Sequence, residues 1–132
     1  MGFLFEKLDV YKKALDFAER IDNLCTELPR GTKHFSDQLR RASVSISLNV
    51  AEGNGRWHKK DRRNFFYIAR GSAFECIPLL ELIQRKGCLP KSALQALKEE
   101  VNIISKMLTS LIKGTEDKTN NRKWNNRTID HN

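Results

Sequence analysis

The chain has no run of apolar residues near the ~20 that a membrane-spanning helix needs, so nothing in it predicts a bilayer span. Its cysteines, Cys25, Cys76 and Cys88, are odd in number and show no CxxC spacing, which argues against a disulfide framework and a zinc site. The three histidines are isolated and lack neighbours at metal-ligand spacing. We therefore expect buried free thiols, no metal and no cofactor.

The first residues also lack the features of a targeting segment. MGFLFEK has no basic region, long apolar run or small-residue cleavage site, so it does not read as a secretory signal. Glu6 stands where myristoylation of Gly2 would need Ser or Thr. A cytoplasmic protein without a membrane anchor is the expectation.

Apolar residues recur at spacings of three and four along four stretches, which predicts an all-α fold of amphipathic helices. The expected helices cover residues 5–28, 36–53, 60–86 and 90–114. Ser36 is the expected N-cap of the second helix. Pro78 should bend the third helix rather than divide it, because the apolar pattern resumes in phase at Leu79. Short connections favour an antiparallel up-down-up-down four-helix bundle over residues 5–113.

Residues 114–132 form a basic tail that is rich in Asn, Thr and Lys. Such a segment buries too little apolar surface to offset the entropy of ordering, so we expect it to be disordered. Elsewhere the basic charge is concentrated. Residues 30–70 hold ten Lys and Arg against three acidic residues, a net +7 of the chain's +8. This asymmetry predicts an attraction for polyanions.

The second predicted helix carries two apolar lines instead of one. Its core line holds Phe35, Leu39, Ala42, Ile46 and Val50, and a second line holds Val44, Leu48 and Ala51. Between them runs a polar row of Arg41, Ser45, Asn49, Glu52 and Arg56. A helix with one buried side has no use for the second apolar line, so we expect another surface to cover it.

Two interpretations of the polar row remain open. In the first, the row is a hydrogen-bond network in which Glu52 pairs with Arg56 or with a neighbouring helix, while Ser45 and Asn49 bond across the bundle. In the second, it is a ligand site. Catalysis is disfavoured, because Ser45 has neither a nearby His nor a suitably spaced Lys to act as its base.

Several of these motifs resemble a known family. The central ones are QLRRASVSI at 38–46, NVAEG at 49–53 and GR at 55–56. Flanking matches are Phe5, Leu8 and YKKA at 11–14, then Phe66, IARGS at 68–72, Glu75 and KML at 106–108. Over about residues 5–113 the chain is similar to the four-helix-bundle family first named for proteins encoded in bacterial 23S rRNA intervening sequences. Pro78 departs from the family pattern.

The resemblance implies an antiparallel four-helix bundle that assembles into a homopentameric ring. It also implies a kinship with accessory proteins of diversity-generating retroelements, whose basic surfaces engage nucleic acid and a reverse transcriptase. No enzymatic activity is attributed to the family. A pentamer would explain the second apolar line, since each subunit would bury it against a neighbour. Val44, Ser45, Leu48, Asn49 and Glu52 are then the expected oligomer motif.

The expected nucleic-acid surface lies mainly on the third helix. Arg63, Tyr67, Arg70 and Phe74 share one stripe there. The bases that could extend it are Arg40, Arg41, Arg56, Lys59, Lys60 and Arg62, together with His58. Bases attract phosphates and an exposed ring can stack on an unpaired base. The alternative is that Tyr67 and Phe74 are core or interface residues while the charges form a solvated face.

The chain is therefore expected to be a non-catalytic oligomer that binds RNA or DNA weakly, in a salt-sensitive way and without strong sequence preference. A ring would raise the avidity for a long strand without new contacts. The second hypothesis is a protein–protein adaptor whose basic face docks an acidic partner, for example a reverse transcriptase. An enzyme ranks third, since nothing in the sequence assembles a catalytic group.

Overall fold

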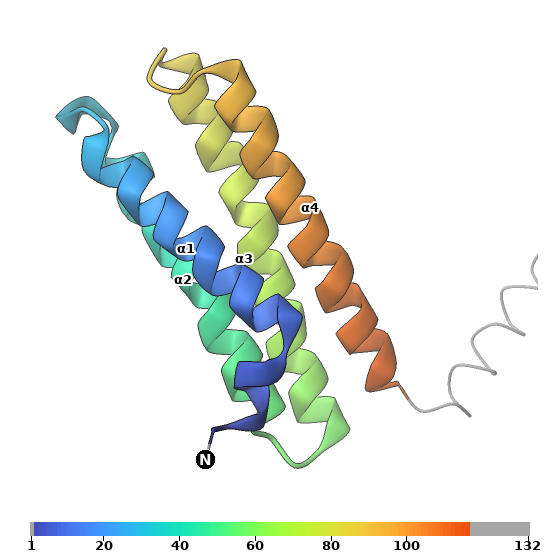
Figure 1. Ribbon diagram of the computed structural model, residues 1–132. Helices are drawn as coiled ribbons and strands as arrows, with labels where there is room; N and C mark the ends of the chain where they lie inside the picture. Colours follow the sequence, from blue (N-terminus) through green and yellow to red (C-terminus); the bar gives the residue numbers. More distant parts are fainter. Residues whose placement is uncertain (1, 117–132) are drawn as a thin grey trace, which may run out of the picture.

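The computed structural model describes residues 2–116. Its order is η1 (Leu4–Lys7), α1 (Asp9–Glu27), η2 (Arg30–Thr32), α2 (Lys33–Asn54), α3 (Lys59–Arg85) and α4 (Lys91–Gly114). Consecutive helices run antiparallel and pack side by side, which confirms the predicted four-helix bundle (Figure 1). The contact between α1 and α4 is the slightest among neighbouring helices. Within the described part of the chain, none of the helices combines the length and apolar character that crossing a bilayer requires.

One hydrophobic core runs along the bundle and draws on all four helices. Its fully buried large side chains are Phe17, Ile21, Leu39, Ile46, Phe66, Leu80, Ile83, Ile104 and Leu108. The core line predicted on α2 is confirmed for Leu39, Ala42, Ile46 and Val50, which are all buried, while Phe35 is partly buried and packs against the core. Burial of this order is the main favourable term in folding.

The α2–α3 connection, the N-terminal η1 and the C-terminal end of α4 all lie at one end of the bundle (Figure 1). The α1–α2 and α3–α4 connections lie at the other end. We call these the lower end and the upper end, as they stand in Figure 1. This arrangement decides which charged residues can act together.

The starts of two helices differ from the prediction. The first stretch starts as the 3₁₀ turn η1 and breaks at Leu8, whose extended backbone (ψ 128°) lets α1 begin only at Asp9. Ser36 is not the N-cap of α2, because the turn η2 leads directly into a helix that already begins at Lys33. Ser36 instead lies buried inside α2, where its hydroxyl donates to the carbonyls of Thr32 and Lys33 at 3.3 and 3.2 Å.

The course of the third helix and the C-terminal boundary of the bundle were also predicted from the sequence. α3 is one element from Lys59 to Arg85 with Pro78 inside it, as predicted, and Pro78 faces the solvent. Thr115 was expected in the disordered tail, but it is buried and belongs to the bundle. Its hydroxyl donates to the carbonyl of Ile112 at 2.6 Å and so closes the end of α4. The rest of the predicted tail, residues 117–132, lies outside the described residues.

Candidate nucleic-acid interface

The polar row of α2 is a hydrogen-bonded strip between α2 and α3. The Ser72 hydroxyl on α3 donates to the Ser45 hydroxyl at 2.9 Å, and the amide of Asn49 donates to Ser45 Oγ at 2.9 Å and to its carbonyl at 2.8 Å. Arg56 Nη2 and Glu52 Oε2 form an ion pair at 3.2 Å one turn further on. The Glu52–Arg56 pair and the Ser45–Ser72 bond to α3 agree with the first interpretation. Asn49, which was expected to bond across the bundle, bonds within α2 instead. These bonds leave Ser45 without a neighbouring base.

The second apolar line of α2 is exposed in this subunit. Val44 is 45% exposed and Leu48 is 61% exposed. Their surroundings follow from the antiparallel pairing of the helices. On α1, Asp22 pairs with Arg40 of α2, and Leu15 lies two turns before Asp22. On α3, Ser72 bonds to Ser45 of α2, and Ile68 lies one turn before Ser72.

Leu15 on α1 and Ile68 on α3 therefore stand at about the level of Leu48 on either side of α2, and both are exposed. We call Leu15, Val44, Leu48 and Ile68 the α2 apolar face. It crosses three helices and lies outside the core. Exposed apolar side chains gathered at one level of a bundle favour an interaction site.

Four of the predicted nucleic-acid contacts are arginines that bond within the bundle. Arg40 joins α2 to α1 through Asp22 Oδ1 at 2.9 Å and Thr26 Oγ1 at 3.0 Å. Arg63 joins α3 to the end of α4, donating from Nε to Thr115 Oγ1 at 3.1 Å and from Nη2 to the Thr115 carbonyl at 2.9 Å.

The other two arginines also rest on side chains of the bundle. Arg70 Nη1 donates to Thr109 Oγ1 on α4 at 3.1 Å, and its guanidinium lies 5.1 Å from the centre of the Tyr67 ring. Arg56, already paired with Glu52, lies over the Phe65 ring at 4.7 Å. These guanidinium groups position the helices. Arg40 and Arg56 are paired with carboxylates, whereas Arg63 and Arg70 keep their charge but use hydrogen-bond donors on neutral threonine groups.

Arg40 and Arg41, the predicted extension of the basic stripe on α2, lie away from the lower end. Both residues lie more than three turns before the end of α2 at Asn54, roughly 20 Å along the helix axis from the lower end. Arg41 is exposed, but the structure does not bring it next to residues 56–63. The bases that the sequence analysis grouped therefore do not all gather at the lower end.

The lower end keeps the bases that stay available. Lys59 and Lys60, in the first turn of α3, are exposed and make no ion pair or side-chain hydrogen bond with residues 2–116. Arg62 is half-buried, and its Nε atom is buried without a partner among those residues. Tyr67 and Phe74 are exposed on the outer side of α3, which excludes the core alternative for both rings.

One residue of this end was missed by the sequence reasoning. Trp57, in the connection between α2 and α3, is 91% exposed, more than any other large apolar side chain in residues 2–116. The available signal was an indole placed among Arg56, His58, Lys59 and Lys60 in a segment without apolar periodicity. An aromatic residue in such a place has no core to enter.

Two buried thiols have acidities that the fold shifts, those of Cys25 and Cys76. Burial raises the pKa of Cys76 to about 12, and burial also raises the pKa of Cys25. Cys25 and Cys76 are buried as predicted, while Cys88 is partly exposed. A raised pKa keeps a thiol protonated and unreactive near neutral pH. The described residues contain no group of three or more side chains that could hold a metal ion.

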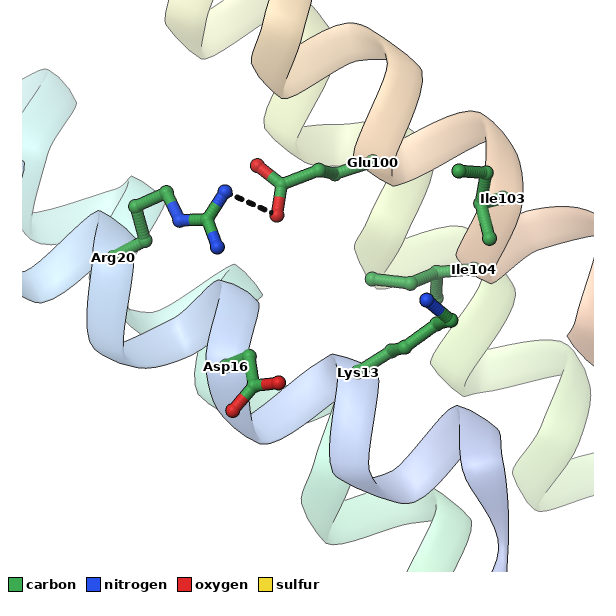
Figure 2. Close-up of a pocket in the computed structure, with 6 residues that line it drawn as sticks. All are labelled: Lys13, Asp16, Arg20, Glu100, Ile103 and Ile104. Atoms are coloured by element: carbon green, nitrogen blue, oxygen red, sulfur yellow. Dashed lines mark ion pairs between the residues drawn. The ribbon is translucent and has the colours of Figure 1, made fainter.

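A small pocket of about 130 Å³ lies between α1 and α4, lined by Lys13, Asp16, Arg20, Glu100, Ile103 and Ile104. Figure 2 shows Arg20 reaching across from α1 to Glu100 on α4, where the two form an ion pair at 2.7 Å. Pockets that bury a drug-sized ligand measure roughly 300–1,000 Å³. The volume and the internal ion pair indicate a gap between two loosely packed helices rather than a substrate site.

Comparison with known proteins supports the family suggested by the motifs. The family model described as 23S rRNA-intervening sequence protein matches residues 6–110. Among solved structures, a protein of unknown function from the S23 ribosomal protein family of Bacteroides thetaiotaomicron is 32% identical to this chain, with a TM-score of 0.74. The match covers 79% of this chain and 95% of that one. No curated protein matches the chain significantly.

Proposed function

The chain belongs to the family of 23S rRNA-intervening sequence proteins, and from that premise we propose that it is a non-catalytic homo-oligomer that binds nucleic acid through its lower end. The observation that carries the proposal is the contrast between the two kinds of base. Four of the predicted arginines, Arg40, Arg56, Arg63 and Arg70, hydrogen-bond inside the bundle, whereas Lys59 and Lys60 are exposed together and make no ion pair or side-chain hydrogen bond with residues 2–116. Unpaired lysines in a basic segment attract phosphates.

The oligomer rests on the α2 apolar face. Two leucines, a valine and an isoleucine stay about half exposed in one subunit, and burying the remaining surface of each would contribute about half of the roughly 1.5–3 kcal/mol that complete burial of such a side chain provides. A second copy of the chain is the occupant that the family resemblance implies, in a homopentameric ring. Such a ring would present several lower ends to one strand and raise its avidity.

The nucleic-acid part is tested with Lys59→Gln/Lys60→Gln. The matched control is Lys33→Gln/Lys91→Gln, which removes the same charge from exposed lysines in the first turns of α2 and α4, at the upper end. Affinity for a single-stranded homopolymer is measured at several salt concentrations. The first variant should bind more weakly, with a slope of log K against log salt that is smaller by about 1.4 if both lysines contact phosphates of a single strand.

The control should keep the affinity and the salt slope of the wild type, apart from the small general effect of removing two positive charges. Equal losses in the two variants would mean that only net charge matters, and the lower end would no longer be the site. A protein that shows no saturable binding near physiological salt would be a protein–protein adaptor instead, and the proposal would be wrong.

The oligomer is tested with Val44→Ser/Leu48→Ser, compared with Ile103→Ser, which alters a similarly exposed residue of α4. Mass measurement in solution should give several subunits, five for the ring, for the wild type and the control, and monomers for the double variant. Helical content should not change, because neither side chain belongs to the core. A wild type that remains monomeric at high concentration would refute the assembly.

A further inference from the structure

The α2–α3 connection exposes an indole that the fold does not use. Trp57 is 91% exposed, and its neighbours in the sequence are basic residues rather than apolar ones that could shelter it. An exposed Trp side chain leaves a large apolar surface in contact with water, and such residues are enriched at sites that bind a partner. Trp57 therefore needs an occupant for its ring faces.

The connection that carries Trp57 is anchored on both sides. On the α2 side, the Gly55 amide donates to the carbonyls of Ala51 and Glu52 at 3.2 Å, and the Arg56 amide donates to the carbonyl of Gly53 at 3.2 Å. The Arg56 side chain is fixed as well, by Glu52 and by the Phe65 ring.

On the α3 side, the Arg62 amide donates to the carbonyl of His58 at 3.0 Å. This bond lies at the start of α3, which begins at Lys59, two residues after Trp57. The indole thus projects from a short, held turn. A ring presented from a fixed backbone loses less freedom when a ligand stacks on it.

The charges around the indole identify the chemistry of the occupant. Lys59 and Lys60 follow within three residues, and Asp61 is the only acidic residue between Gly53 and Arg70. A second copy meeting this end with its own lower end would bring together like charges, which is unfavourable. The complementary ligand is anionic and offers a flat apolar surface. An unpaired nucleic-acid base with its flanking phosphates has both properties.

We propose that the α2–α3 connection is a stacking site for an unpaired base of single-stranded nucleic acid, with Trp57 as the stacking surface and Lys59 and Lys60 as contacts to the flanking phosphates. This inference rests on the proposed nucleic-acid function and adds its substrate class. In a duplex both faces of each internal base are already stacked, so Trp57 has nothing to engage there. Preference for single strands is the consequence, despite the higher charge density of a duplex.

The test uses a thymidine oligonucleotide of about 12 nucleotides, within the span that single-strand sites cover, and a blunt duplex with the same number of phosphates. Trp57→Ala should lower affinity for the single strand by roughly 5-fold to 150-fold, as expected for loss of one base–aromatic stack. The salt slope should not change, because no phosphate contact is removed. Trp57→Phe should recover most of the affinity, and Leu82→Ala, an exposed apolar residue near the upper end of α3, should have no effect.

Fluorescence gives a second readout. The chain has two tryptophans, Trp57 and Trp124, so a Trp124→Phe background reports on Trp57 alone. The single strand should quench that emission and the duplex should not. Because Trp57 packs against so little of the chain, its replacement should leave the helical content and the melting temperature unchanged.

The outcomes separate this inference from the proposal on which it rests. If Lys59→Gln/Lys60→Gln weakens binding while Trp57→Ala does not, the lower end binds phosphates but the stacking site is refuted. Equal affinity for duplex and single strand without quenching refutes it as well. Absence of binding to either probe overturns the proposed function together with the inference. If Trp57→Ala instead breaks the oligomer, the indole is a subunit contact and the stacking site is wrong.

Discussion

Two helical glycines allow the same substitution to be tested with opposite expected signs. Gly53 lies in α2 where α3 passes closest: a Cβ added there would come within 2.8 Å of Phe66 Cε1 and 2.9 Å of Phe65 Cβ. Phe66 is 1% exposed and cannot retreat. Overpacking of this kind costs about 1–3 kcal/mol. The gain in helix propensity from Gly to Ala is at most about 1 kcal/mol, so Gly53→Ala should destabilise by up to about 2 kcal/mol.

Gly71 provides the control. It lies in the interior of α3, it is exposed, and a Cβ added there would meet nothing within 4 Å. Only the propensity difference remains, so Gly71→Ala should stabilise by up to about 1 kcal/mol. Urea denaturation followed by circular dichroism at one fixed protein concentration measures both variants. A Gly53→Ala protein as stable as Gly71→Ala would refute the close approach of the two helices.

Three further predictions concern stability. Folding raises the pKa of Cys76 from 9.0 to about 12, so the unfolded chain loses the thiol proton at a lower pH than the folded chain. The free energy of unfolding should therefore fall as pH rises above 9, by roughly 1 kcal/mol at pH 10. Urea titrations of Cys76→Ala should lack this loss, and a pH dependence identical to that of the wild type would contradict the burial of the thiol. Pro78→Ala should raise the free energy of unfolding by about 1–3 kcal/mol, and with it the melting temperature, because it restores a backbone hydrogen bond at an exposed site of α3. A lower melting temperature would show that the fold needs the proline. Arg63→Gln should lower the free energy of unfolding by about 1–3 kcal/mol, because it loses two hydrogen bonds to Thr115. In the same urea assay, Lys60→Gln should change the free energy of unfolding by no more than about 0.5 kcal/mol. Equal losses in the two variants would mean that Arg63 does not stabilise the end of α4.

The helices and their core faces could be predicted because periodicity alone determines them. Leu39, Ala42, Ile46 and Val50 recur at helical spacing and enter the core as expected. The start of α2 could not be predicted in the same way. Ser36 has the composition of an N-cap, but the turn at residues 30–32 already supplies the helix start, and Ser36 satisfies its hydroxyl on the backbone one turn earlier. Local preference was overridden by the course of the preceding turn.

The candidate site was predicted less completely, because a sequence shows a charge but not its partner. Arg40 and Arg63 are separated from Asp22 and Thr115 by 18 and 52 residues, and only the packed bundle brings these pairs together. Trp57 was missed for the opposite reason. It belongs to no periodic pattern, and its importance follows from an exposure that only the folded chain reveals.

The division of labour between arginine and lysine limits what the lower end can recognise. Planar guanidinium groups suit two-point bonding, and here Arg40 and Arg63 use that geometry to join helices, while Arg70 joins α3 to α4 through a single bond. The charges left for a ligand, Lys59 and Lys60, are mobile point charges that hold phosphates without reading base edges. Sequence preference, if measured, would then have to follow the stacking strength of individual bases on Trp57, with purines favoured over pyrimidines. A preference that follows the hydrogen-bonding edges of the bases, and survives Trp57→Ala, would contradict this assignment of roles.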